Sequence, residues 1–190
     1  AAIGQKNLKR LAAYSSIGHM GYVLAGVSTG TNQGIQSSIT YTSIYLFMNL
    51  AFFSCLFMLR RDEKYFENIE DLSGLSKNHP ILSFSFLIVL FSLAGIPPLA
   101  GFFAKFYIFS AVIEKSMYFL AITGLISTVI AAFYYLRLIK IIYFDSEKEK
   151  YESNHNIGLK ISLVISSIFI LLYFIYPSPL IEIVEKINII

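Results

Sequence analysis

One lysine of the sequence follows a helix-breaking motif inside an apolar segment. Lys105 comes after Gly95-Ile96-Pro97-Pro98, and residues 78–104 include no charged side chain. Each proline lacks an N–H group and clashes with the carbonyl four residues before it, so the carbonyls of Leu93 and Ala94 should be free. By helical rise, Lys105 lies near the middle of a bilayer core about 30 Å thick. An amine held in such surroundings exchanges protons near neutral pH more readily than a surface lysine does, so Lys105 is a candidate proton carrier.

The alternative is that Lys105 only extends its ammonium group to the membrane surface, as long basic side chains near helix ends do. Placing a charged side chain at the centre of the bilayer costs about 2.5–3.5 kcal/mol of insertion free energy. Lys105 should therefore either extend to the membrane surface or have a specific function. The neighbouring Phe102, Phe103, Phe106 and Phe109 indicate a dry environment, and we expect a functional position.

A second candidate lies near the beginning of the chain. Ser15, His19 and Tyr22 follow one another at i, i+4 and i+7, which places them on one face of a helix. An imidazole inside a membrane can pass protons between neighbours. The alternative is a structural histidine whose ring bonds Ser15 or a backbone carbonyl, and the spacing alone leaves both open.

A third pattern is a polar stripe on the following apolar segment. Ser38, Thr42, Tyr45 and Asn49 recur at i, i+4, i+7 and i+11. Such a stripe can line a hydrated path, with Thr42, Tyr45 and Asn49 as path residues, or it can hold helices together by hydrogen bonds.

The elements that must position these residues are membrane helices. The mean hydropathy is +0.65, and charged residues make up 14% of the chain against about 25% in soluble domains. We predict an all-α polytopic membrane protein with one membrane domain over residues 1–190. The expected transmembrane segments are residues 11–27, 37–59, 81–113, 117–142 and 160–176. The third is expected to be discontinuous at Gly95–Pro98.

The basic residues predict the orientation. With five segments crossing the membrane, twelve of the fifteen lysines and arginines fall on one side and Lys115 and Lys186 on the other. The twelve are Lys6, Lys9, Arg10, Arg60, Arg61, Lys64, Lys77, Arg137, Lys140, Lys148, Lys150 and Lys160. The positive-inside rule places that side, with the N-terminus, in the bacterial cytoplasm or mitochondrial matrix and the C-terminus opposite. The charge therefore describes topology and does not support nucleic-acid binding.

Several classes of site are missing from the sequence. There is one cysteine, Cys55, and no GxGxxG, P-loop, HExxH or CxxC motif. We therefore expect no cofactor and no metal in this chain. It begins with Ala1 and has no signal peptide, so we expect a fragment or a naturally split subunit.

Two long motifs resemble the antiporter-like subunits of respiratory complex I. They are residues 5–22, QKNLKRLAAYSSIGHMGY, and residues 92–107, SLAGIPPLAGFFAKFY; the second, with Phe106-Tyr107 after the lysine, looks like subunit 2, the N subunit. The resemblance implies helices ten to fourteen of a fourteen-helix subunit. It also implies that Lys105 lies beside the break of helix twelve, in a chain of buried ionisable groups that carries protons.

The same resemblance implies the partners and cofactors. The glutamate and lysines of the family's earlier helices have no counterpart here, so this chain would supply one half of a proton path. The preceding part of the subunit and other membrane-arm subunits would be its partners. NADH, FMN, iron–sulfur clusters and quinone would bind other subunits of NADH:quinone oxidoreductase. Two alternatives stay open: a subunit of a multisubunit Na⁺/H⁺ antiporter, and a structural membrane module that moves no ions.

Overall fold

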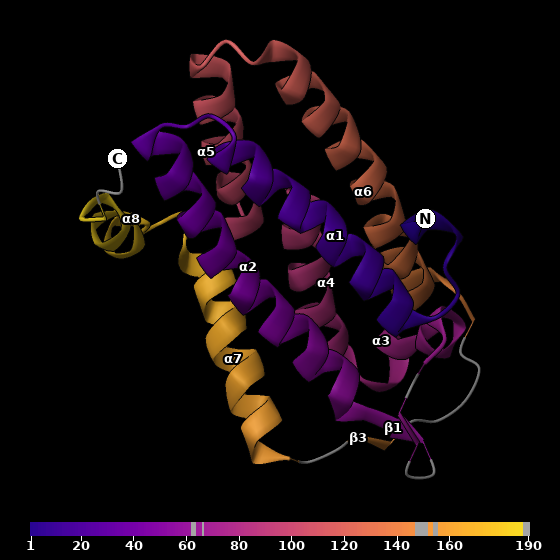
Figure 1. The fold of residues 1–190 in the computed structure, drawn as a ribbon. Coiled ribbons are helices and arrows are strands. Elements are labelled where there is room, and N and C mark those ends of the chain that lie inside the picture. The colour runs from indigo at the N-terminus through magenta and orange to yellow at the C-terminus, as the bar shows by residue number, and fades with distance from the viewer. Residues whose placement is uncertain (62–63, 66, 147–151, 154–155, 188–190) are drawn as a thin grey trace.

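The computed structural model describes residues 1–61, 64–65, 67–146, 152–153 and 156–187. Six helices of ten or more residues pack side by side in a bundle (Figure 1). They are α1 (Leu8–Val27), α2 (Asn32–Met58), α4 (Pro80–Ala94), α5 (Ala100–Glu114), α6 (Tyr118–Phe144) and α7 (Ile157–Leu172). Lys148 and Lys150, which entered the orientation argument, lie outside the described residues.

The shorter elements lie at the ends of the bundle. They are the 3₁₀ helices η1 (Ala2–Gly4) and η2 (Ile69–Leu72), the helices α3 (Leu75–Asn78) and α8 (Ser178–Glu185), and the strands β1 (Leu59–Arg61), β2 (Lys64–Tyr65) and β3 (Glu152–Ser153). The strands form one antiparallel sheet in the order β2-β1-β3, with Arg60 opposite Tyr65 and Leu59 opposite Ser153. This small sheet and α8 were not predicted, because the prediction considered only segments long enough to cross a membrane.

Capping residues account for most differences between the predicted and observed helix ends. The side chain of Asn7 accepts a hydrogen bond from the Arg10 N–H, so α1 begins at Leu8 instead of residue 11. Thr31 accepts from the Gly34 N–H and starts α2 at Asn32 instead of residue 37. Both are preferred N-cap residues.

The last two predicted segments also differ from the observed helices. Asn156 accepts a hydrogen bond from the Gly158 N–H, so α7 begins at Ile157 instead of residue 160. It ends at Leu172 instead of residue 176, before Pro177, because a helix seldom continues into a proline. The predicted 117–142 segment corresponds to α6, Tyr118–Phe144.

The predicted 81–113 segment consists of two helices. Helix α4 ends at Ala94 and α5 begins at Ala100. Gly95 has a φ of +87°, in the left-handed region, and its N–H bonds the carbonyls of Phe91 and Ser92 at 3.1 and 2.9 Å. Gly95 therefore ends α4 in the usual manner of a C-terminal glycine.

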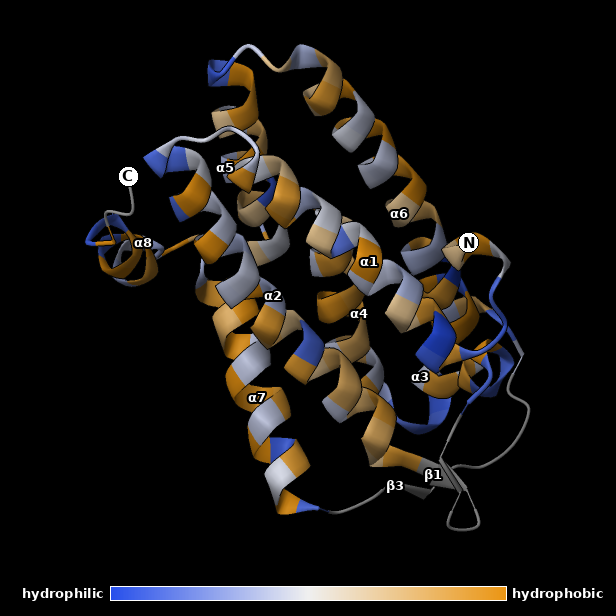
Figure 2. Cartoon of the chain, viewed as in Figure 1, coloured by the Kyte–Doolittle hydropathy of each residue, from blue (hydrophilic) through white to orange (hydrophobic). Residues whose placement is uncertain are grey.

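Hydrophobic residues are frequent along the helices of the bundle (Figure 2). Helices α2 and α6 are long and apolar enough to cross a membrane by length and composition. Only 22% of the most apolar window of α6 is buried inside the protein, and Phe119 and Val129 on this helix are 84% and 72% exposed. Exposed apolar area of this extent is costly in water and favourable in lipid.

Candidate functional site

The side chain of Lys105 bridges the break between α4 and α5. It is 5% exposed, and its Nζ donates hydrogen bonds to the carbonyl oxygens of Leu93 and Ala94 at 3.1 and 3.0 Å. These are the two carbonyls expected to be free at the end of α4. A helix C-terminus carries partial negative charge and favours a cation, so the ammonium group lies where the backbone best accommodates its charge.

Two more contacts define the surroundings of Lys105. Its Nζ lies 5.4 Å from the centre of the Tyr22 ring, within the range of a cation–π interaction. A Cβ atom added to Gly95 would lie 3.0 Å from Lys105 Cδ and 3.1 Å from Nζ. The backbone of Gly95 therefore touches the lysine directly, and a side chain there would displace it.

The beginning of α5 is fixed against the end of α4. The N–H of Gly101 donates to Ser92 Oγ at 3.0 Å, and the Ser92 hydroxyl donates to Met48 Sδ at 3.0 Å. A Cβ on Gly101 would lie 1.9 Å from the Ser92 carbonyl oxygen, so only glycine permits this approach. The prolines Pro97 and Pro98 lie in the connection between the two helices.

His19 is buried between two tyrosines. It is 2% exposed; its Nδ1 lies 2.7 Å from the hydroxyl of Tyr41 and its Nε2 3.0 Å from the hydroxyl of Tyr135. The ring of Tyr45 stacks on the imidazole with centroids 4.5 Å apart. Ser15 hydrogen-bonds the same Tyr135 hydroxyl. Ser15, Tyr135, His19 and Tyr41 thus form a continuous hydrogen-bonded chain across α1, α6 and α2.

The chemistry of its members allows this hydrogen-bonded chain to carry a proton. A neutral imidazole donates from one nitrogen and accepts at the other, whereas a tyrosine hydroxyl can do both. A proton received at one nitrogen of His19 and released from the other leaves the ring as the opposite tautomer. The two hydroxyls at its two nitrogens are the partners that such a transfer requires.

Tyr22 contacts both halves of the site. Its ring centre lies 6.2 Å from that of His19 and 5.4 Å from Lys105 Nζ, and its hydroxyl accepts a hydrogen bond from Thr128 at 3.0 Å. Among the described residues, no hydrogen bond joins His19 to Lys105 directly. The aromatic ring of Tyr22 is close to both.

The predicted polar stripe divides among several roles. Ser38 donates to the carbonyl oxygens of Val23 and Gly34 at 2.9 and 2.8 Å, which ties α2 to α1. Thr42 is exposed and bonds only its own helix, at Ser38 O, 2.8 Å away. The Tyr45 hydroxyl donates to Ser16 at 2.8 Å. Ser38 and Tyr45 hydrogen-bond residues of α1, as the alternative of hydrogen bonds between helices expects.

Tyr41 and Tyr135 were missed by the sequence analysis. Tyr41 is one residue away from Thr42 and so lies off the stripe, and Tyr135 lies on a helix with tyrosines at two successive positions. Both are fully buried, at 0% and 1% exposure. Each tyrosine combines an apolar ring with a hydroxyl that can form hydrogen bonds. The sequence, however, did not indicate which side of α6 faces α1.

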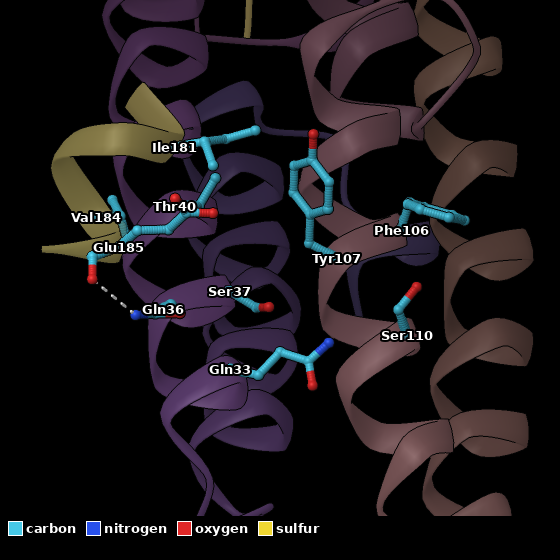
Figure 3. A pocket seen from close by; sticks show the side chains of 10 residues that line it. All are labelled: Gln33, Gln36, Ser37, Thr40, Phe106, Tyr107, Ser110, Ile181, Val184 and Glu185. Atoms are coloured by element: carbon cyan, nitrogen blue, oxygen red, sulfur yellow. Dashed lines mark hydrogen bonds between the residues drawn. The ribbon is translucent and has the colours of Figure 1, made fainter. Parts of the chain in front are cut away.

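Two cavities lie between helices at the border of the bundle. One of about 310 Å³ lies between α2, α5 and α8 and is lined by polar side chains such as Gln33, Ser37 and Ser110 (Figure 3). Ser110 lies about 140° around α5 from Lys105, so this cavity is on another face of the helix. A second cavity of about 280 Å³ lies between α1 and α6 and reaches Ser15 and His19.

Among the residues that the structure describes, no three His, Cys, Asp or Glu side chains are grouped closely enough to hold a metal ion.

The sequence and the fold are similar to those of respiratory membrane proteins. Residues 1–131 match the family model described as "NADH:quinone oxidoreductase/Mrp antiporter, TM". The NADH-quinone oxidoreductase subunit N of Pelagibacter ubique is 76% identical over all 190 residues, and that of Methylobacterium nodulans is 51% identical over 181. The chain spans 40% and 37% of the lengths of these curated relatives.

Chains of solved membrane complexes have a similar fold. A chain of respiratory complex I from Thermus thermophilus superimposes with a TM-score of 0.78 and 28% identity, over 95% of this chain and 41% of that one. A chain of an archaeal membrane-bound sulfane sulfur reductase gives 0.83 and 27%, over 97% of this chain and 37% of that one. A chain of the Mrp complex from Dietzia gives 0.80 at 18% identity, over 96% and 42%, which indicates a shared fold only.

Proposed function

Because the chain belongs to the NADH:quinone oxidoreductase/Mrp antiporter membrane family, we propose that it forms part of a proton-translocating subunit in the membrane arm of an NADH:quinone oxidoreductase. It is an integral membrane protein by its family and by the exposed apolar surface of its helices. The identity to subunit N relatives supports the assignment to this complex.

The proposed topology has five membrane crossings within a single domain. Helices α1, α2, α6 and α7 each cross once, and α4 with α5 together form one discontinuous crossing. The basic side, with the N-terminus, faces the bacterial cytoplasm or mitochondrial matrix, and the C-terminus faces the other side.

Lys105 is the proposed protonatable group of the path. The observation that carries the proposal is its ammonium group, buried at the helix break and hydrogen-bonded to the carbonyls of Leu93 and Ala94. A buried ionisable side chain within a membrane is rare and marks ion pathways and proton relays. The break, with Gly95, Pro97 and Pro98, supplies the backbone acceptors that make this position tolerable.

The chain of Ser15, Tyr135, His19 and Tyr41 is the proposed relay beside Lys105. Each of these groups can give up one proton as it receives another, so no charged tyrosine is needed. The ring of Tyr45 stacks on the imidazole, and the ring of Tyr22 makes a T-shaped contact with it. Because no hydrogen bond between described residues joins His19 to Lys105, a proton passes between them either by water or by a movement of the Lys105 side chain.

This chain would supply one half of a proton path. The partners are the lipid bilayer, the preceding part of the same subunit and the other membrane-arm subunits. NADH, FMN, iron–sulfur clusters and quinone belong to other subunits, and the residues here do no redox chemistry.

A Mrp-type Na⁺/H⁺ antiporter subunit is the second candidate, since the family description covers both and the fold is shared. A native gel of gently solubilised membranes separates the two. The proposed function predicts that the chain migrates with the large band that stains for NADH dehydrogenase activity. Migration in a separate band without that activity would favour the antiporter.

Replacing His19 with glutamine tests the relay. The amide can still donate to one tyrosine and accept from the other, but it cannot carry a proton. We expect the complex to assemble normally and NADH-driven proton translocation to fall about tenfold, measured with a pH-sensitive dye in sealed vesicles.

The matched control is His79→Gln, because His79 is a partly exposed residue at the start of α4. Normal translocation by the His19→Gln variant would show that His19 has only a structural role. If Lys105 also proved dispensable, the chain would be a structural membrane module that moves no ions, since such a module needs neither group.

A further inference from the structure

Asn49 of α2 lies beside the hydrogen-bonded chain but has no partner in it. Its side chain is partly buried, and among the described residues no hydrogen bond to its amide is found. By contrast, the hydroxyls of Ser38, Thr42 and Ser43 on the same helix all bond backbone carbonyls. A partly buried amide without a protein partner can bind a water molecule.

Asn49 is one of the residues that line a small cavity. This cavity has a volume of about 10 Å³, and its lining includes Ser15, Tyr45, Asn49, Leu93 and Tyr135. A volume of about 10–15 Å³ holds one water molecule. A buried water typically makes two to four hydrogen bonds, and Asn49, Ser15 and Tyr135 offer three polar groups around this space.

The cavity lies at the Ser15 end of the hydrogen-bonded chain of Ser15, Tyr135, His19 and Tyr41. Ser15 and Tyr135 bond each other, and Tyr135 bonds His19, so a molecule between Asn49 and these hydroxyls would be the next member. Ser15 lies about 8 Å from Arg10 by helical rise, on the side of His19 that faces the basic ends of the helices. Asn49 and Ala12, both partly buried, place the cavity at the seam between α1 and α2.

We propose that this cavity binds a single water molecule and that Asn49 positions it as the donor of protons to the Ser15–Tyr135–His19 chain. The inference rests on the proposed function, since the chain must carry protons for the water to matter. It adds a ligand, a positioning residue and a point of entry at the α1–α2 seam.

The transfer balances without a charged intermediate on tyrosine. The water gives a proton to the oxygen of Tyr135 as that hydroxyl releases its own proton to Nε2 of His19. The imidazole releases a proton from Nδ1 to the oxygen of Tyr41 as that hydroxyl releases its own proton to a further water molecule of the path. The water recovers its proton from the solvent side of the seam, so each group ends with the number of protons it began with.

The test uses the complete subunit in its assembled complex. Asn49→Leu removes the amide at similar volume, and Asn49→Ser keeps a polar group and leaves room for a water. The control is Ser43→Ala, which removes a hydroxyl of the same helix, outside the stripe, that donates to Ile39 O of that helix. We expect Asn49→Leu to slow proton translocation about fivefold, and both Asn49→Ser and Ser43→Ala to stay within twofold of the native rate.

A high-resolution structure of the complex provides a readout independent of pumping. Density for a water within hydrogen-bonding distance of Asn49, Ser15 and Tyr135, absent in Asn49→Leu, is the expected result. No water there in the native complex, or a native rate for Asn49→Leu, would overturn the inference. Lys105→Met measured in parallel separates the two proposals: if it lowers translocation and Asn49→Leu does not, only the water site fails.

Discussion

Replacing Lys105 with methionine is expected to lower NADH-driven proton translocation about tenfold without preventing assembly. Methionine has a similar length and suits the apolar surroundings, but it carries no proton. It also leaves the carbonyls of Leu93 and Ala94 without the donor they have in the native protein. Each lost hydrogen bond costs about 1 kcal/mol, which the packed helices can absorb.

The measurement is the ratio of protons translocated to NADH oxidised in sealed vesicles, with the amount of assembled complex determined on a native gel. Lys115→Met is the matched control, because Lys115 is exposed at the end of α5. An unchanged ratio for Lys105→Met would refute the role of Lys105 and favour a module that moves no ions.

Replacing Gly95 with alanine is expected to disturb both the break and the lysine. The φ of +87° is unfavourable for any residue with a Cβ, at a cost of about 1–2 kcal/mol. The new Cβ would also lie 3.0 Å from Lys105 Cδ and 3.1 Å from Nζ, so the lysine side chain must shift, which weakens its hydrogen bonds to the two carbonyls. We expect a lower thermal stability of the complex and a loss of translocation similar to that of Lys105→Met.

Two further variants separate backbone strain from the lysine contact. Gly95→Asn tolerates the left-handed conformation better than alanine does but brings the same Cβ against Lys105. Gly18→Ala is the control, because a Cβ there meets no atom within 4 Å. If Gly95→Asn restored full translocation, the contact with Lys105 would be unimportant and strain alone would explain the alanine variant.

The sequence predicted the parts of the site that depend on local chemistry. The prolines and Gly95 indicated where helical hydrogen bonding stops. Lys105 indicated a charge inside an apolar membrane segment, which needs hydrogen-bond acceptors. The apolar segments located the long helices to within a few residues. The errors at the helix ends arose at Asn7, Thr31 and Asn156, where capping side chains extend a helix beyond its apolar part.

The parts that depend on helix rotation could not be predicted. His19 was identified, but its partners Tyr41 and Tyr135 come from α2 and α6, and helical periodicity on α1 says nothing about which faces of other helices meet it. For the same reason the stripe from Ser38 to Asn49 left a hydrated path and hydrogen bonds between helices both open. Helix α8 was missed because it is too short to cross a membrane.

The reach of Lys105 from α5 back to the end of α4 makes proton binding and helix position thermodynamically linked. If moving α5 away from α4 weakens the hold of Lys105 on its proton by some factor, loss of that proton loosens the attachment of α5 by the same factor. Mechanical work done on α5 by a neighbouring subunit could therefore be converted into proton release, and a proton gradient could drive the displacement in reverse. A two-carbonyl contact at a helix break is enough to make such a coupling reversible.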